Sequence, residues 1–128
     1  MPEPTRTTKL SRRRGSRKGE GTVVVSRPSR WGNPYKVVAK SSGPDGWVVV
    51  RTHKPGVELG RWPTLLEATE QAVALFEAWA RRSDDPGAVW IREHVHELAG
   101  KTLGCWCEID DPCHRSVLAR MADEAVAD

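Results

Sequence analysis

The sequence predicts an α/β fold: a small two-layer or three-layer sheet with parallel core strands, an antiparallel edge ribbon and about three helices. Three observations favour it. The unbroken valines of the strand Thr22–Ser26 are typical of a strand covered on both faces, two helical patterns follow the ribbon, and a second strand is predicted at Lys101–Cys107. If the two strands lie side by side in parallel, the two helices form the crossover between them.

The ribbon is predicted at Lys36–Ala39 and Trp47–Thr52. The residues between them, 41–46, are rich in glycine, proline and aspartate, which is typical of a hairpin loop. The segment His53–Arg61 is polar and contains glycine, so the sequence predicts a connection there. The two strands should therefore form an antiparallel pair at one edge of the fold.

Capping residues define the three helices. Thr64 and Glu67 form a capping box at the start of a helix that runs to about Arg82. A second helix is predicted over Asp85–Gly100, with glycine at its end. A third begins with Asp111 as N-cap and Pro112 at its first position.

The N-terminal part of the chain is basic. Residues 1–30 carry nine Lys and Arg against two Glu, a net charge of +7, whereas the rest carries 11 against 15, a net charge of −4. Residues 1–21 show no periodicity, so we expect a basic flexible arm over residues 1–20 and a single α/β domain over residues 21–128. Such an arm either lies along the phosphates of a nucleic acid or is a disordered, solubilising extension.

The composition also indicates the cellular compartment of the protein. No apolar run reaches the roughly 20 residues that span a bilayer, and the N-terminus lacks the apolar core of a signal peptide. We expect a cytoplasmic protein with no membrane partner. The three cysteines are odd in number and clustered, which argues against a disulfide framework and for thiols or a metal site.

The first segment rich in potential ligand-binding residues is the loop that follows the first strand. Arg27, Arg30, Trp31, Asn33 and Tyr35 lie within nine residues there, interrupted by two prolines and a glycine. Guanidinium groups bind oxyanions and aromatic rings stack on bases, so we expect these five residues to bind a nucleotide or a phosphorylated small molecule. The alternative is a structural turn in which Trp31 fills the edge of the core.

The second such segment lies at the junction of the last strand and the last helix. Cys113, His114 and Arg115 are predicted in the first helical turn, where free backbone N–H groups and the helix dipole favour an anion or a thiolate. Arg115 would bind phosphate. If the site is the active site of an enzyme, Cys113 is the nucleophile and His114 or Asp111 carries the proton. Both segments follow carboxyl ends of parallel strands, so we expect them to meet in one cleft.

The cysteine cluster has two other interpretations. A zinc ion held by Cys105, Cys107, Cys113 and His114 has acceptable chemistry, but adjacent helical residues point about 100° apart. No metal or cofactor is therefore predicted, and zinc stands as the alternative. In the other interpretation, cysteines beside a tryptophan pack as small buried residues.

These observations lead to two function classes. The first is a nucleotide- or phosphate-ligand-binding α/β protein, including an enzyme that acts on a nucleotide or modified base through the Cys-His corner. The second is a small nucleic-acid-binding or host-interaction module that uses the basic arm, with a structural or zinc-binding cysteine cluster. Salt dependence separates the two, because only binding through the arm should weaken steeply with ionic strength.

Three motifs together resemble a known family. The segment Arg27–Pro34, the run Gly104–Cys107 and the triplet Pro112–His114 are similar to those of domain-of-unknown-function family 4326, typical of bacteria and their phages. The resemblance covers about residues 8–123. The family name records no established activity, so the resemblance implies membership and no particular reaction. Family members usually carry an acidic residue two positions after the histidine, where this chain has Ser116.

Overall fold

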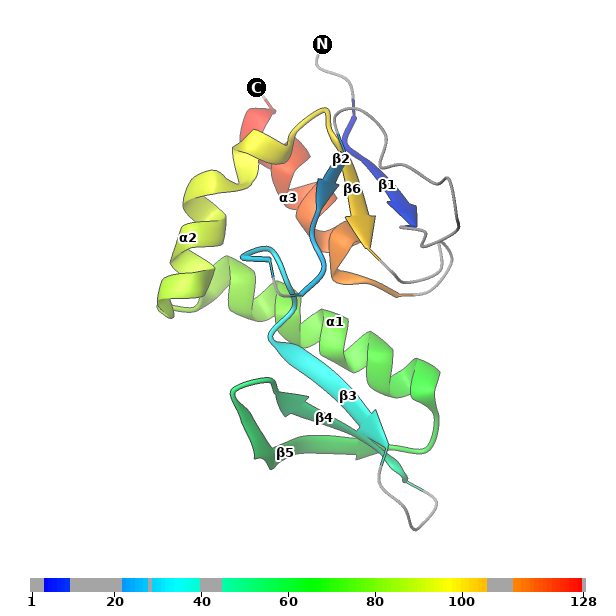
Figure 1. Ribbon diagram of the computed structural model, residues 1–128. Helices are drawn as coiled ribbons and strands as arrows, with labels where there is room; N and C mark the ends of the chain where they lie inside the picture. Colours follow the sequence, from blue (N-terminus) through cyan, green and yellow to red (C-terminus); the bar gives the residue numbers. More distant parts are fainter. Residues whose placement is uncertain (1–3, 10–21, 28, 40–44, 106–111, 128) are drawn as a thin grey trace.

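A computed structural model describes residues 4–9, 22–27, 29–39, 45–105 and 112–127 (Figure 1). These residues form two three-stranded sheets, three α-helices and one short 3₁₀ helix. In chain order the elements are β1 (Arg6–Lys9), β2 (Thr22–Val24), β3 (Tyr35–Ala39), β4 (Trp47–Arg51), β5 (Lys54–Trp62), α1 (Leu65–Arg82), α2 (Pro86–His94), the 3₁₀ helix (Val95–Leu98), β6 (Thr102–Cys105) and α3 (His114–Val126).

The parallel sheet confirms the predicted α/β class. Its order is β1-β6-β2, and β2 runs parallel to β6 with Thr22 opposite Thr102 and Val24 opposite Gly104. The crossover between β2 and β6 contains α1 and α2, as predicted. The expectation that the first strand is covered on both faces holds only in part, because Thr22–Val24 are half-buried. Among the described residues, β2 pairs with β6 alone. The fully buried valine is Val25, which follows the strand.

The strand β1 was not predicted. Arg6–Lys9 pairs in parallel with β6, from Arg6 opposite Thr102 to Lys9 opposite Cys105, so the expectation that residues 1–21 contain no element is wrong for this stretch. Residues 10–21, which hold most of the predicted arm, lie outside the described residues. An edge strand needs backbone pairing more than apolar alternation, which explains why the hydrophobic pattern gave no signal.

The antiparallel sheet confirms the predicted ribbon and adds a strand to it. Its order is β3-β4-β5, and all neighbours are antiparallel. The expectation that His53–Arg61 is a connection is wrong, because Lys54–Trp62 pairs with β4. The register shifts between Val49 and Arg51, so the pairing is irregular there. β5 is long, and most of its described residues are exposed. An exposed strand can carry polar side chains, so its sequence resembles that of a loop.

The helix α1 joins the two sheets. Its N-cap is confirmed, since the Glu67 backbone N–H donates to the Thr64 hydroxyl at 3.1 Å. Ala68 and Ala72 pack with Val49 of the antiparallel sheet, whereas Phe76 belongs to the core of the parallel sheet. Figure 1 shows α1 running between the two sheets. One helix therefore fixes where the second half of the chain lies relative to the β3-β4-β5 sheet.

The other two helices also follow the prediction, with one shift. α2 begins at Pro86 after Asp85, and Gly100 has a φ of 77°, which suits glycine at the end of this helical segment. α3 begins at His114 with Cys113 as its N-cap, so the expectation of Pro112 at the first helical position is wrong. Asp111, the predicted N-cap, lies outside the described residues.

Thr5, just before β1, forms hydrogen bonds with α3 near the other end of the described chain. Its backbone N–H and its hydroxyl donate to Asp123 Oδ1 of α3 at 3.1 and 2.6 Å, and the Gly100 N–H donates to the same hydroxyl at 3.1 Å. A hydrogen bond to a charged group stabilises a protein by about 1.5–3 kcal/mol. These bonds anchor β1 beside α3.

We predict that Thr5→Val lowers the free energy of unfolding by about 1–3 kcal/mol, because valine keeps the shape but removes the hydroxyl from Asp123 and Gly100. Urea denaturation followed by circular dichroism measures the change. Thr7→Val in β1 is the matched control, and we expect a smaller effect there. Equal stability of Thr5→Val and the unchanged chain would show that β1 is not anchored through this hydroxyl.

Candidate ligand-binding site

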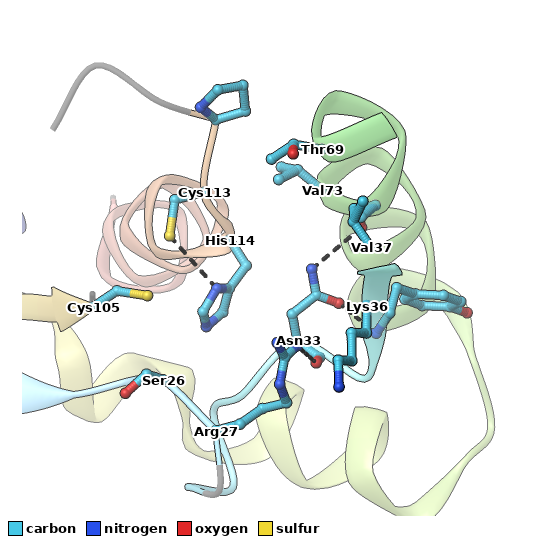
Figure 2. A pocket seen from close by; sticks show the side chains of 13 residues that line it. Ser26, Arg27, Asn33, Lys36, Val37, Thr69, Val73, Cys105, Cys113 and His114 are labelled. Carbon is cyan, nitrogen blue, oxygen red and sulfur yellow. Dashed lines mark hydrogen bonds between the residues drawn. The ribbon is translucent and has the colours of Figure 1, made fainter. Parts of the chain in front are cut away.

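A cleft of about 380 Å³ lies where the two sheets, α1 and the start of α3 meet. Figure 2 shows His114 between the two cysteines on one side and the Asn33, Arg27 and Lys36 side chains on the other. The lining residues come from both segments that the sequence analysis singled out and from α1: Ser26, Arg27, Asn33, Tyr35, Lys36, Val37, Thr69, Ala72, Val73, Cys105, Pro112, Cys113 and His114.

The loop between β2 and β3 is shaped by two short turns. Ser29 N–H donates to the Ser26 carbonyl and Gly32 N–H donates to the Ser29 carbonyl, both at 3.0 Å. A Cβ at Gly32 would lie 2.9 Å from Arg27 Cγ and 3.0 Å from Arg27 Cα, so a larger residue would displace the Arg27 backbone. Glycine is therefore required by close approach within this loop.

Asn33 connects the loop to its neighbours. Its amide nitrogen donates to the Ala72 carbonyl of α1 at 3.3 Å, and its side-chain oxygen accepts from Tyr35 N–H at 2.8 Å. The residue is buried and lines the cleft. Both ends of the amide are used by backbone groups, so the structure gives Asn33 a positioning role beside the predicted binding role.

Two cations line the cleft. Arg27 donates from Nη1 to the Asn33 carbonyl at 2.7 Å, which fixes its guanidinium against the loop. Lys36, on β3, is exposed, and it was not among the predicted ligand residues. None of the described residues that line the cleft is acidic. The cleft therefore carries positive charge without a neutralising carboxylate among these residues.

Two of the predicted ligand residues lie elsewhere. Arg30 and Trp31 do not line this cleft: the Arg30 guanidinium lies 5.1 Å from the Trp90 ring centre, and the Trp31 and Trp90 ring centres are 4.7 Å apart. Trp31 packs against the main core, as in the structural alternative. Tyr35 does line the cleft, and its hydroxyl accepts from Arg51 at 3.3 Å. The expected meeting of the two segments holds through Arg27, Asn33 and Tyr35.

Arg115 is also absent from the cleft lining. It is only 1 % exposed, and its Nη1 donates to the Thr8 and Cys105 carbonyls at 3.3 and 3.4 Å. One residue after His114, the helix has turned by about 100° and directs the side chain toward the sheet. The predicted phosphate ligand is therefore placed as a buried residue that links β1, β6 and α3.

Three potential ligand atoms gather at the start of α3. The sulfur atoms of Cys105 and Cys113 and a ring nitrogen of His114 all lie within 4.8 Å of one another, and all three residues are buried. Cys113 Sγ and His114 Nδ1 are 3.7 Å apart. The objection that adjacent helical side chains diverge does not apply, because Cys113 has extended backbone angles, φ −153° and ψ 143°. Cys107, the fourth candidate ligand, lies outside the described residues.

The His114 ring is held in one tautomer. Its Nε2 lies 2.7 Å from the Val25 carbonyl, and since a carbonyl only accepts, Nε2 carries the proton and donates. Burial lowers the pKa of His114, and the nearby charges of Arg27 and Arg115 lower it further, although the Val25 bond and Cys105 act in the opposite direction. The neutral ring then presents the Nδ1 lone pair to Cys113, where it can accept a thiol proton or bind a metal ion.

The α1 wall of the cleft was not predicted from the sequence. Thr69, Ala72 and Val73 lie on one side of α1, at the three- and four-residue spacing of one helix face, and Lys36 comes from β3. The same spacing predicts a helix face buried in the core, so it does not distinguish a cleft wall from core packing. Only the placement of α1 against α3 gives this face its role.

The fold and the site together define an α/β protein with a cationic cleft and a buried Cys-Cys-His group. The chain belongs to the family described as a domain of unknown function, DUF4326, whose profile matches residues 8–124. This confirms the resemblance seen in the motifs. Neither the curated proteins nor the solved structures compared with the chain gave a match. Within the described residues, every helix is too short or too polar to span a bilayer.

We predict that acidification destabilises the chain through His114. Its pKa in the folded chain is lowered from the ordinary 6.5, so the unfolded state binds more protons below that pH. The contribution of neutral His114 to the free energy of unfolding is complete above about pH 6.5, and it decreases as the pH falls below that value. Urea denaturation at about pH 7.5 and about pH 5.5, with a chelator present, should show lower stability at the lower pH.

His114→Gln should reduce this loss, because glutamine can donate to the Val25 carbonyl without titrating. His96→Gln is the matched control, since His96 is exposed, and it should keep the pH dependence of the unchanged chain. If His114→Gln loses as much stability on acidification as the unchanged chain, the buried histidine is not the group responsible.

Proposed function

We propose that the chain binds an anionic, phosphate-bearing small molecule, with nucleotides as the first class to test. The observation that carries the proposal is the cleft of about 380 Å³ that has two cations and, among the described lining residues, no carboxylate. Pockets of roughly 300–1,000 Å³ suit small molecules. A guanidinium and an ammonium are the side chains that recognise phosphate.

The two cations have different roles in this proposal. Arg27 is held by its bond to the Asn33 carbonyl and by contact with Gly32, so it provides a preorganised donor group. Lys36 is exposed and its ammonium is a compact charge on a flexible stem, so it provides charge and less directional contact. The pair supports binding of a phosphate group at the β2–β3 side of the cleft.

The remaining walls support binding of the uncharged part of such a ligand. Val37, Ala72 and Val73 give an apolar surface, and the Tyr35 ring lies beside them. Ligand pockets commonly combine apolar walls with a few polar groups that fix orientation. A base or sugar would lie against these side chains while its phosphate contacts the cations.

We predict that Lys36→Gln weakens binding of the best-bound nucleotide by about threefold to tenfold, because the substitution removes one partly screened charge. A thermal-shift screen of nucleotides and inorganic phosphate selects the ligand, and isothermal titration calorimetry measures its dissociation constant. Lys54→Gln is the matched control, because Lys54 is an exposed lysine on β5 that does not line the cleft.

Two results would contradict the proposal. One is equal binding by Lys36→Gln and Lys54→Gln. The other is that no nucleotide or phosphate binds in the screen, whereas duplex DNA binds with an affinity that falls steeply with salt and is unaffected by Lys36→Gln, since that pattern belongs to the basic N-terminal segment.

A further inference from the structure

We propose that Cys105, Cys113 and His114 form a zinc-binding site at the wall of the cleft. The two sulfur atoms and the ring nitrogen lie within 4.8 Å of one another. This inference goes beyond the binding of an anion, and it does not require any ligand in the cleft. It also reverses the sequence-based expectation of no metal, whose physical reason was the helical geometry that Cys113 does not have.

The separations fit a shared ion. With Zn–S of about 2.3 Å and Zn–N of about 2.0–2.1 Å, neighbouring ligand atoms of a tetrahedral zinc site are about 3.5–3.8 Å apart. Cys113 Sγ and His114 Nδ1 are already 3.7 Å apart. The largest separation in the group, 4.8 Å, exceeds the tetrahedral value by about 1 Å, which a rotation about the Cα–Cβ bond of a cysteine can close.

The surroundings of His114 match those of a metal ligand. A ligating histidine usually donates its second ring N–H to a carboxylate, a carbonyl or a water, which fixes the ring and its tautomer. Here Nε2 donates to the Val25 carbonyl at 2.7 Å, and the Phe76 ring lies edge-on at 5.2 Å. The Nδ1 lone pair is consequently directed toward the cysteine side, where an ion would bind.

The chemistry of the donors selects the ion. Two thiols and one imidazole favour zinc over magnesium or calcium, which prefer oxygen ligands. All three residues line the cleft, so a water or a ligand atom from the cleft can complete the coordination. A zinc ion held by two thiolates and a neutral imidazole carries no net charge, so the positive charge of the cleft would still come from Arg27 and Lys36. The ion would also bind the Cys113 thiolate that the enzymatic interpretation uses as a nucleophile.

The full chain, expressed with zinc and purified without chelator, should contain about one zinc per chain by elemental analysis. Removing it and adding Co²⁺ should give thiolate-to-cobalt charge-transfer absorption and the visible bands of a tetrahedral ion. Zinc should raise the melting temperature of the metal-free chain. These measurements use the unchanged chain, so they do not depend on whether a variant folds.

Single substitutions then locate the site. Cys105→Ser, Cys113→Ser and His114→Gln should each weaken zinc affinity by more than about tenfold, as loss of even an outer-shell partner can do. His96→Gln should leave zinc content and the cobalt spectrum unchanged, because His96 is exposed on the 3₁₀ helix.

The inference is overturned if the folded chain holds no zinc and gains neither thermal stability nor a cobalt spectrum. It is also overturned if zinc is lost in His96→Gln but retained in the three cluster variants. Rapid alkylation of Cys113 in protein supplied with zinc would count against it too, since a bound thiolate is protected. A failed nucleotide titration would leave these readouts unchanged, so the two proposals fail separately.

Discussion

The hydrogen bond from His114 Nε2 to the Val25 carbonyl, at 2.7 Å, connects the parts of the chain on which the site depends. It joins the end of β2 to the first residue of α3, which are 89 residues apart in sequence. Because the bond fixes the tautomer, it also decides which nitrogen faces the cysteines. This buried contact thus links the start of the β2–β3 loop to the start of α3 and sets which ring nitrogen faces the cysteines.

The sequence was sufficient to predict the topology that creates this contact. Valines at Val23–Val25 and a short apolar strand before the Cys-His corner imply parallel neighbours, and two intervening helices imply a crossover. The carboxyl ends of such strands meet at one edge, which explains why Arg27, Asn33 and His114 line one cleft. This part of the site follows from the parallel pairing of β2 with β6, and the hydrophobic pattern predicted that pairing but not the presence of β1.

The errors in the predicted ligand residues concern the direction of single side chains. Arg115 carries the charge expected of a phosphate ligand, but one helical step turns it toward backbone carbonyls that need a donor. Arg30 and Trp31 have the composition of a nucleotide site, yet Trp90 of α2 lies close enough to contact both. Residue type constrains the interactions a side chain can make, and only the fold decides which partner is near.

The Thr5–Asp123 contact has a consequence for synthesis and folding. It joins residues 118 positions apart, so β1 gains this anchor only after α3 has been synthesised. Pairing between distant segments raises contact order and slows folding. β1 can pair with β6 before α3 is complete, but it lacks its contact with Asp123 until then. Premature termination within α3 before Asp123 would leave β1 without that anchor even if every earlier element were intact.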